Sequence, residues 1–395
     1  MMKHLSLFII LISIGSCIDR FDFNIPDSDL QLVVDGRITD APGPYTVKIT
    51  RTQKLNNLLF PPTVSAKAVT IFDNVGNSET LTEIKAGIYQ TSPTGIRGVI
   101  GRVYTLRIET FDNKIYESSP EKINPAGTVD SIYYEFQKNV SLEGVSGYQF
   151  KIFMNSRGEP QGDNHFLWKL TGTYKVITSP ELHIILTQRL NDPPPPPKKD
   201  PRVCSGYVYN PRTDQLDYVK PCECCTCWAS LVDSKPHVSD NNIVANGQFN
   251  KVDMGAIPVD FWPFWDKTMV KVEQLSLSNA AFNYWKAVRD QQEGAVSLFQ
   301  PAISKAVSNI FLKNGKEEVQ GLFQASAISK NFIFLSAKDI PLGSGIIPPP
   351  PSLPPRYIPT PGLVYEEFLS EPFVVREACT GAFAHSTTQQ PIDWK

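Results

Sequence analysis

Residues 45–52 read YTVKITRT, in which apolar Val47 and Ile49 alternate with polar side chains. Successive side chains of a strand point to opposite faces, so Val47 and Ile49 would share one side. Residues 101–110, GRVYTLRIET, alternate in the same way. This period of two, without a helical period, indicates antiparallel β-strands.

Further strand-like segments surround these two, and turn residues such as the PGP of 42–44 separate them. Short strands joined by turns at this spacing are typical of a β-sandwich. We therefore predict an antiparallel β-sandwich over residues 30–125, and both an immunoglobulin-like and a transthyretin-like topology fit the pattern. The additional segments are 32–38, 68–73, 87–91 and 115–118.

The rest of the chain, residues 126–395, predicts a second β-rich domain with one or two helices. Proline-rich runs at 193–197 and 348–351 indicate extended, exposed loops, because proline fixes the backbone and removes a hydrogen-bond donor. Cysteines gather beside the first of these loops. The strand-like segments are 129–136, 148–154, 165–170 and 173–177.

A helix is indicated between a capping serine, Ser276 or Ser278, and Gly294. Apolar residues recur there at helical spacing, which predicts one buried face. We expect Tyr284 and Trp285 to pack this helix on a sheet, since large aromatic side chains are usually buried.

The N-terminus carries the pattern of a lipoprotein signal peptide, residues 1–16. A positively charged start precedes the apolar run 5–14, which is too short to span a bilayer as a helix. Small residues Gly15 and Ser16 then precede Cys17, an arrangement that resembles a bacterial lipobox. We expect cleavage before Cys17 and lipid attachment to it, and acyl chains at about 0.8 kcal/mol per buried CH₂ would make the anchor lasting. The alternative is an ordinary secretory signal with a chance cysteine at its end.

Residues 17–29 would form a lipidated tether to the first domain. Asp19 and Asp22 follow the cysteine closely. In Bacteroidota, acidic residues at this place resemble a signal for display on the cell surface, whereas the simpler interpretation is a polar linker. We expect a lipid-anchored protein of the outer membrane, on the cell surface rather than on the periplasmic face.

Composition narrows the class of protein. Hydrophobic residues make up 41% of the chain, enough for packed cores, so wholesale disorder is excluded. Lys and Arg number 38 against 40 Asp and Glu. A nucleic-acid-binding domain usually carries a strong basic excess, so we expect no nucleic-acid partner.

Six cysteines remain if Cys17 carries lipid. An even number in an exported chain predicts disulfides. Bridging the neighbours Cys224 and Cys225 would strain the peptide, so twelve of the fifteen possible pairings stay open. A C-x-C-C-x-C motif could instead hold zinc or copper(I), but it fits the usual C-x₂-C spacing poorly, and we expect no metal. Partly free thiols are the third possibility. The six are Cys204, Cys222, Cys224, Cys225, Cys227 and Cys379.

The sequence offers little catalytic chemistry. Its histidines are scattered, and no H-E-x-x-H, G-x-S-x-G or phosphate-loop motif occurs. The one suggestive segment is DFWPFWD, residues 260–266, where Asp260 and Asp266 flank four aromatic side chains. Paired carboxylates cleave glycosides when about 5 Å or 6.5–9.5 Å apart, and exposed aromatics bind sugars or proteins. The simpler interpretation is a core or interface strand with aromatic anchors. The candidate binding surface is Phe261, Trp262, Phe264 and Trp265.

The order of motifs along most of the chain resembles a family of Bacteroidota lipoproteins built around a domain of unknown function. Members are often encoded beside TonB-dependent outer-membrane receptors. The tail of the family is richer in cysteine than Cys379-Thr380-Gly381 here. The resemblance implies no established activity, so it transfers no catalytic residue and no cofactor. The motifs are the lipobox at Cys17, LVVDGRIT at 32–39, GRVYTL at 101–106, CCTCW at 224–228 and VEQLSLS at 272–278.

These observations predict a non-enzymatic outer-membrane lipoprotein without a cofactor. Because genes of the family often lie beside those of TonB-dependent receptors, the resemblance implies an accessory or ligand-binding partner of such a receptor. Two alternatives stay open, a surface protein that binds or hydrolyses glycans and a purely structural envelope protein.

Overall fold

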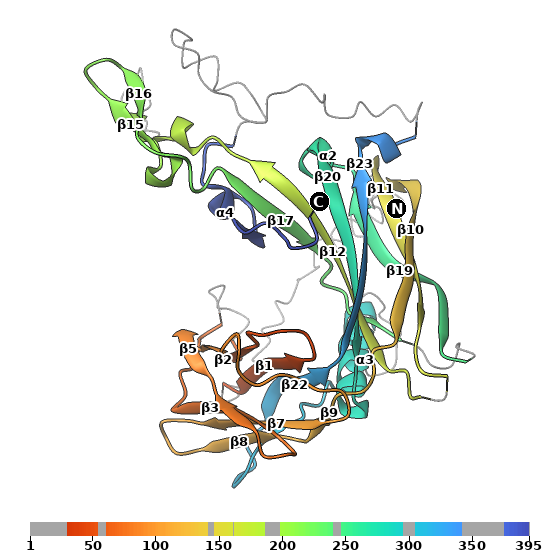
Figure 1. Ribbon diagram of the computed structural model, residues 1–395. Coiled ribbons are helices and arrows are strands. Elements are labelled where there is room, and N and C mark those ends of the chain that lie inside the picture. The colour runs from red at the N-terminus through yellow and green to blue at the C-terminus, as the bar shows by residue number, and fades with distance from the viewer. Residues whose placement is uncertain are drawn as a thin grey trace, which may run out of the picture.

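The computed structural model describes residues 30–53, 61–140, 146–160, 162–185, 198–239, 246–294, 305–341 and 375–394. It is mainly β, with antiparallel pairing nearly throughout and few helices, as the alternating segments predict (Figure 1). The signal peptide, Cys17, the tether and both proline runs lie outside the described residues.

Two sheets form the first domain and share one hydrophobic core. Val47 and Ile49 lie in this core and Lys48 is exposed, which confirms the alternation in YTVKITRT. The strands encoded by residues 32–122 are β1 (Leu32–Thr39), β2 (Thr46–Arg51), β3 (Ala68–Asp73), β4 (Ser78–Thr80), β5 (Thr82–Lys85), β6 (Ile88–Gln90), β7 (Val103–Glu109), β8 (Ile115–Ser118) and β9 (Glu121–Lys122).

Strands from the far end of the chain complete this domain, so the limits 30–125 are wrong. β22 (Val319–Ser326) pairs in parallel with β1, and β21 (Ile310–Leu312) pairs with β8. Phe323 of β22 is fully buried in the first core. The sheet orders are therefore β22-β1-β2-β6-β5 and β21-β8-β7-β3-β4. Nothing local in the sequence signals a pairing between strands so far apart along the chain.

The second domain packs two sheets around its own core, which includes Phe150, Phe166 and Trp168. The indole of Trp168 donates a hydrogen bond to Gln274 Oε1 at 2.6 Å, which satisfies its buried N–H. One sheet is β10 (Thr128–Val140), β11 (Ser146–Arg157) and β19 (Gln248–Pro258). The other has the order β23 (Ile328–Ser336), β20 (Lys267–Ser276), β12 (Phe166–Ile177), β17 (Thr226–Val232) and β24 (Ser386–Thr387), with β18 (His237–Val238) beside β12.

The predicted long helix is α3 (Asn279–Gly294), and it lies where the two domains meet (Figure 1). Ser278 begins it, because its hydroxyl accepts a hydrogen bond from the Ala281 N–H at 3.1 Å. Ala281 packs with Leu322 of the first domain and Leu167 of the second. Tyr284 and Trp285 join this cluster as half-buried side chains, which confirms the expected packing.

A buried carboxylate fixes this junction. Glu121 of β9 is 1% exposed. It accepts hydrogen bonds from the Ser278 hydroxyl at 2.5 Å and from Asn309 Nδ2 at 2.9 Å. Burial raises the pKa of Glu121. One side chain of the first domain thus holds both the start of α3 and the chain entering β21.

The remaining described elements are short. They comprise η1 (Pro180–Leu182), β13 (Ile184–Ile185), β14 (Lys198–Lys199), η2 (Val203–Ser205), β15 (Tyr207–Asn210), β16 (Gln215–Tyr218), α2 (Phe261–Trp265), η4 (Ala337–Asp339) and α4 (Cys379–Ala382).

Candidate functional site

All six cysteines after Cys17 form disulfides. Cys204 pairs with Cys224, Cys222 with Cys225, and Cys227 with Cys379. The prediction of disulfides is confirmed. These sulfurs are no longer thiolates, so the metal and free-thiol alternatives for them are wrong.

Two of these bridges hold the base of a hairpin that projects from the second domain (Figure 1). We call residues 203–225 the stapled hairpin. Its strands β15 and β16 pair from Tyr207–Tyr218 to Asn210–Gln215. The Glu223 N–H also donates to the Cys204 carbonyl at 2.9 Å, so the base is closed covalently and by backbone hydrogen bonding.

The stapled hairpin exposes apolar side chains. Val203 is 88% exposed, Val208 56%, Tyr218 62% and Val219 64%. A groove of about 380 Å³ is lined by Val203, Val208 and Val219, and Lys199 and Lys220 also line it. Apolar side chains gathered on a rigid projection mark a contact surface more often than a free surface. Sequence reasoning missed these residues, although the spacing of Cys204 and Cys222 brackets a hairpin.

An ionic cluster ties the C-terminal segment to the root of the stapled hairpin. The Arg202 guanidinium donates to both carboxylate oxygens of Glu377, at 2.7 to 3.0 Å. His183 Nε2 lies 3.1 Å from the same carboxylate. The hydrogen bonds from Arg202 lower the pKa of Glu377. A bidentate arginine–carboxylate pair fixes orientation as well as distance, so this contact sets how the segment approaches.

The bridge from Cys227 to Cys379 continues this attachment on the face of β17. Both residues are fully buried, beside Tyr174 and Val176. The Cys379 N–H donates to the Cys224 carbonyl at 3.0 Å. Three kinds of contact, covalent, ionic and backbone, therefore hold residues 375–394 against the cysteine-rich strand.

The aromatic segment 260–266 folds as the short helix α2 instead of the expected strand. Phe264 is fully buried and stacks on Phe150 at 5.3 Å between ring centroids, so it belongs to the core and offers no binding surface. Trp262 packs edge-to-face on Phe383 at 5.6 Å. Trp265 is half-buried, and the backbone of Phe261 begins the helix.

The two aspartates of this segment, Asp260 and Asp266, are both exposed. Asp260 affects a neighbour, because its charge adds to burial in raising the pKa of Tyr174. A glycosidase needs its carboxylates in an enclosed site with one pKa raised. Neither aspartate is enclosed, since both side chains are exposed.

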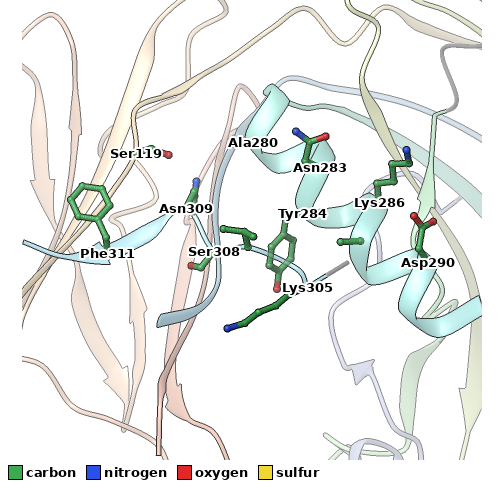
Figure 2. A pocket seen from close by; sticks show the side chains of 12 residues that line it. Ser119, Ala280, Asn283, Tyr284, Lys286, Asp290, Lys305, Ser308, Asn309 and Phe311 are labelled. Atoms are coloured by element: carbon green, nitrogen blue, oxygen red, sulfur yellow. The ribbon is translucent and has the colours of Figure 1, made fainter. Parts of the chain in front are cut away.

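A pocket of about 700 Å³ lies between α3 and the chain that leads into β21. Two of the three ionic side chains that line it are already paired, since Lys305 lies 2.6 Å from Glu318 and Asp290 lies 2.9 Å from Arg289, and the third is Lys286. These pairings favour a structural role for both groups. Figure 2 shows Ala280, Asn283, Tyr284, Lys286 and Asp290 along α3, facing Lys305, Ser308, Asn309 and Phe311.

A family comparison now places the chain. Residues 18–331 match the family described as a domain of unknown function, DUF4249. The chain belongs to this family. Neither a curated protein nor a solved structure matches the chain.

The DUF4249 match covers the stapled hairpin and the three cysteines that precede Trp228, but it ends before Cys379. The bridge from Cys227 therefore joins the family region to a segment outside it. Within the described part of the chain, no group of three or more His, Cys, Asp or Glu is placed to hold a metal ion. No helix there is long and apolar enough to cross a membrane.

Proposed function

We propose that this DUF4249 protein is a non-enzymatic outer-membrane lipoprotein that binds a TonB-dependent receptor through the stapled hairpin. The observation that carries the proposal is the set of exposed apolar side chains on a disulfide-closed projection. Lipid on Cys17 would hold the protein at the membrane, on the cell surface, where such a receptor opens.

The chemistry of the hairpin suits protein contact. Binding costs free energy when flexible loops become ordered, and the two bridges at the base remove much of that cost beforehand. Tyrosine is enriched among the residues that dominate binding energy, and Tyr218 stands exposed on the hairpin. Lys199 and Lys220 beside the groove are already paired with Asp214 and Glu223, so the apolar side chains carry the proposed contact.

The proposed anchor leaves room for this contact. Thirteen positions separate Cys17 from residue 30, where the described chain begins. A fully extended tether of that length reaches at most about 45 Å at roughly 3.5 Å per residue. The domains could therefore move over a neighbouring receptor while they stay attached to the membrane.

Lipid attachment is tested first. Cells that carry the tagged full chain are fed an alkyne-labelled fatty acid, and the protein is captured and examined by mass spectrometry. The proposal expects label on a peptide that begins at Cys17 and no label in Cys17→Ala. An unlabelled mature chain that begins elsewhere would refute the anchor.

The partner is tested by gentle detergent extraction from native membranes, capture through a C-terminal tag and mass spectrometry. We expect a TonB-dependent barrel in stoichiometric amount. A double variant, Val208→Asp with Tyr218→Asp, should lose the barrel, because it places charge on the proposed contact surface.

The matched control is Val75→Asp, since Val75 is also exposed, at 59%, but lies in a turn of the first domain. It should keep the barrel. Recovery of the protein alone, under conditions that preserve known barrel complexes, would refute the receptor partner. Equal barrel recovery by the hairpin variant and the control would refute the hairpin as the contact.

A further inference from the structure

A second cleft lies between the outer face of the first domain and the face of the second domain's larger sheet. Its volume is about 470 Å³. Three cationic side chains line it, Arg37, Lys48 and Lys169, against the one carboxylate of Asp35. Trp285 of α3 lines another part of the wall. The cleft is therefore cationic with an apolar flank.

Arg37 reaches the cleft because of the alternation in β1. Val34 and Ile38 lie in the first core, so Asp35 and Arg37 belong to the opposite, outer face. Lys48 of β2 stands directly opposite Asp35 in the antiparallel register, which places a compensating charge beside that carboxylate. Among the described residues, the guanidinium of Arg37 has neither a hydrogen bond nor an ion pair, although it carries five N–H donors.

Lys169 reaches the cleft from the other side. Its neighbours Trp168 and Leu170 enter the second core, so Lys169 lies on the face of β12 that is turned away from this core. It makes no hydrogen bond or ion pair with another described residue. Burial, together with the positive charge of Arg37, lowers the pKa of Lys169 to about 8.

The nearby carboxylate of Glu273 does not fully neutralise the positive charges of Arg37 and Lys169. It stands opposite Lys169 in the register of β12 and β20, but its oxygen lies 2.9 Å from Lys271. Burial alone would raise the pKa of Glu273, yet the charges of Lys271, Arg37 and Lys169 together lower it. The carboxylate is thus shared among several cations.

We propose that this cleft binds a small ligand through a carboxylate or phosphate group held between Arg37 and Lys169. Half-buried cations without partners are costly, and an oxyanion would supply the missing hydrogen bonds and charge. The planar fork of an arginine matches two oxygens of either group, and a lysine adds a point charge. Trp285, Leu322 and Ile328 on the wall would contact the ring or apolar body of the ligand. This inference stands apart from the receptor partnership, since residues of β1, β2, β12, β22 and α3 line the cleft, whereas the stapled hairpin projects from another part of the second domain (Figure 1).

The test uses the purified full chain in detergent and isothermal titration calorimetry. The probes are glucuronate, inorganic phosphate and, as a neutral match for glucuronate, glucose. We expect glucuronate or phosphate to bind and glucose to bind at least tenfold more weakly. Arg37→Gln and Lys169→Met should each weaken binding of the anion at least tenfold. The control is Lys85→Met, because Lys85 is exposed on β5 and does not line the cleft.

The two anions separate the chemical sources. Glucuronate binding without phosphate binding identifies a carboxylate ligand with a ring body, and the reverse identifies a phosphate ligand. Lack of binding by both anions would overturn the proposal, as would binding that Arg37→Gln and Lys169→Met leave unchanged. Circular dichroism of each variant checks the fold, and Lys169→Met relieves a buried charge, so loss of binding there cannot be assigned to unfolding.

Discussion

Removing the bridge between Cys227 and Cys379 should destabilise the protein far more than removing the bridge between Cys222 and Cys225. The sequence separations are 152 and 3 residues. A cross-link restricts the unfolded chain, and this effect grows with the logarithm of the loop it closes. The loop-closure relation gives about 5 kcal/mol for the long loop and about 1.6 kcal/mol for the short one at 25 °C.

The packing of the long bridge acts in the same direction. Cys227 and Cys379 are both fully buried beside Tyr174 and Val176. Replacement by alanine would leave a small cavity there, at a further cost on the order of 1 kcal/mol. Cys225 is buried, but Cys222 is only half-buried, so their alanine variant leaves less unfilled space.

The comparison uses two double variants, Cys227→Ala with Cys379→Ala and Cys222→Ala with Cys225→Ala. Each loses one bridge and leaves no free thiol among the six cysteines. Urea unfolding followed by tryptophan fluorescence gives the free energy of unfolding of each, and Trp228 and Trp394, 6.4 Å apart, report on this part of the second domain. We expect a difference of about 3.5 kcal/mol or more between the variants. Costs that agree within about 1 kcal/mol would refute the loop-length reasoning.

Three further predictions concern single side chains. Lys169→Met should raise the free energy of unfolding at pH 7 by up to about 3 kcal/mol, because the fall in the pKa of Lys169 from 10.5 to about 8 penalises the charged form in the folded state. The wild type should gain this stability only as the pH rises from about 8 to 10.5. If urea titrations over a pH series show the same rise for the variant, the assignment to Lys169 is refuted. Ser278→Ala should cost about 2 kcal/mol in urea unfolding, because it removes both the cap of α3 and a hydrogen bond to the buried Glu121 carboxylate. No loss would show that other groups replace both contacts. Glu377→Gln should remove a stabilisation that is present above pH 5 and is lost as the pH falls through the lowered pKa of Glu377. Because this side chain is 46% exposed, the effect on the free energy of unfolding should be under about 1 kcal/mol. Hydrogen exchange of residues 375–394 at pH 4 and 7 would detect it.

Local patterns predicted the elements that local physics controls. Alternation around Val47 and Ile49 gave the strands of the first domain, because the period of two follows from strand geometry alone. Ser278 and the apolar spacing after it gave the start and the buried face of α3. Both signals are contained within a few residues, so one sequence suffices to read them.

Pairing between distant segments could not be predicted in this way. β22 lies beside β1, although 280 positions separate Thr39 from Val319. Its sequence, VQGLFQAS, mixes apolar and polar residues, and nothing in it specifies the partner strand. The six cysteines show the same limit, since their even number predicted bridges but only the fold selected one pairing among twelve.

The aromatic segment shows how tertiary packing overrides a local interpretation. Pro263 is the third residue of α2, within the first helical turn, where a missing N–H costs no hydrogen bond. The helical turn places Phe264 in the core of the second domain, where it stacks on Phe150. The sequence pattern alone did not indicate this placement. Trp262 and Phe264 therefore serve packing, and the exposed apolar side chains lie instead on the stapled hairpin.

The pairing of β22 with β1, which the sequence did not predict, also forms the cationic cleft. β22 adds to the edge of β1 and continues into β23 at the edge of the second domain's sheet after the single residue Ala327. So short a connection holds the outer face of β1, with Arg37, against the face of β12 that carries Lys169. Arg37 and Lys169 are thus brought into one cleft by the pairing of β22 with β1 and its direct continuation into β23. A site of this kind is invisible in sequence because Arg37 and Lys169 belong to different domains, and only the return of the chain brings them into one cleft.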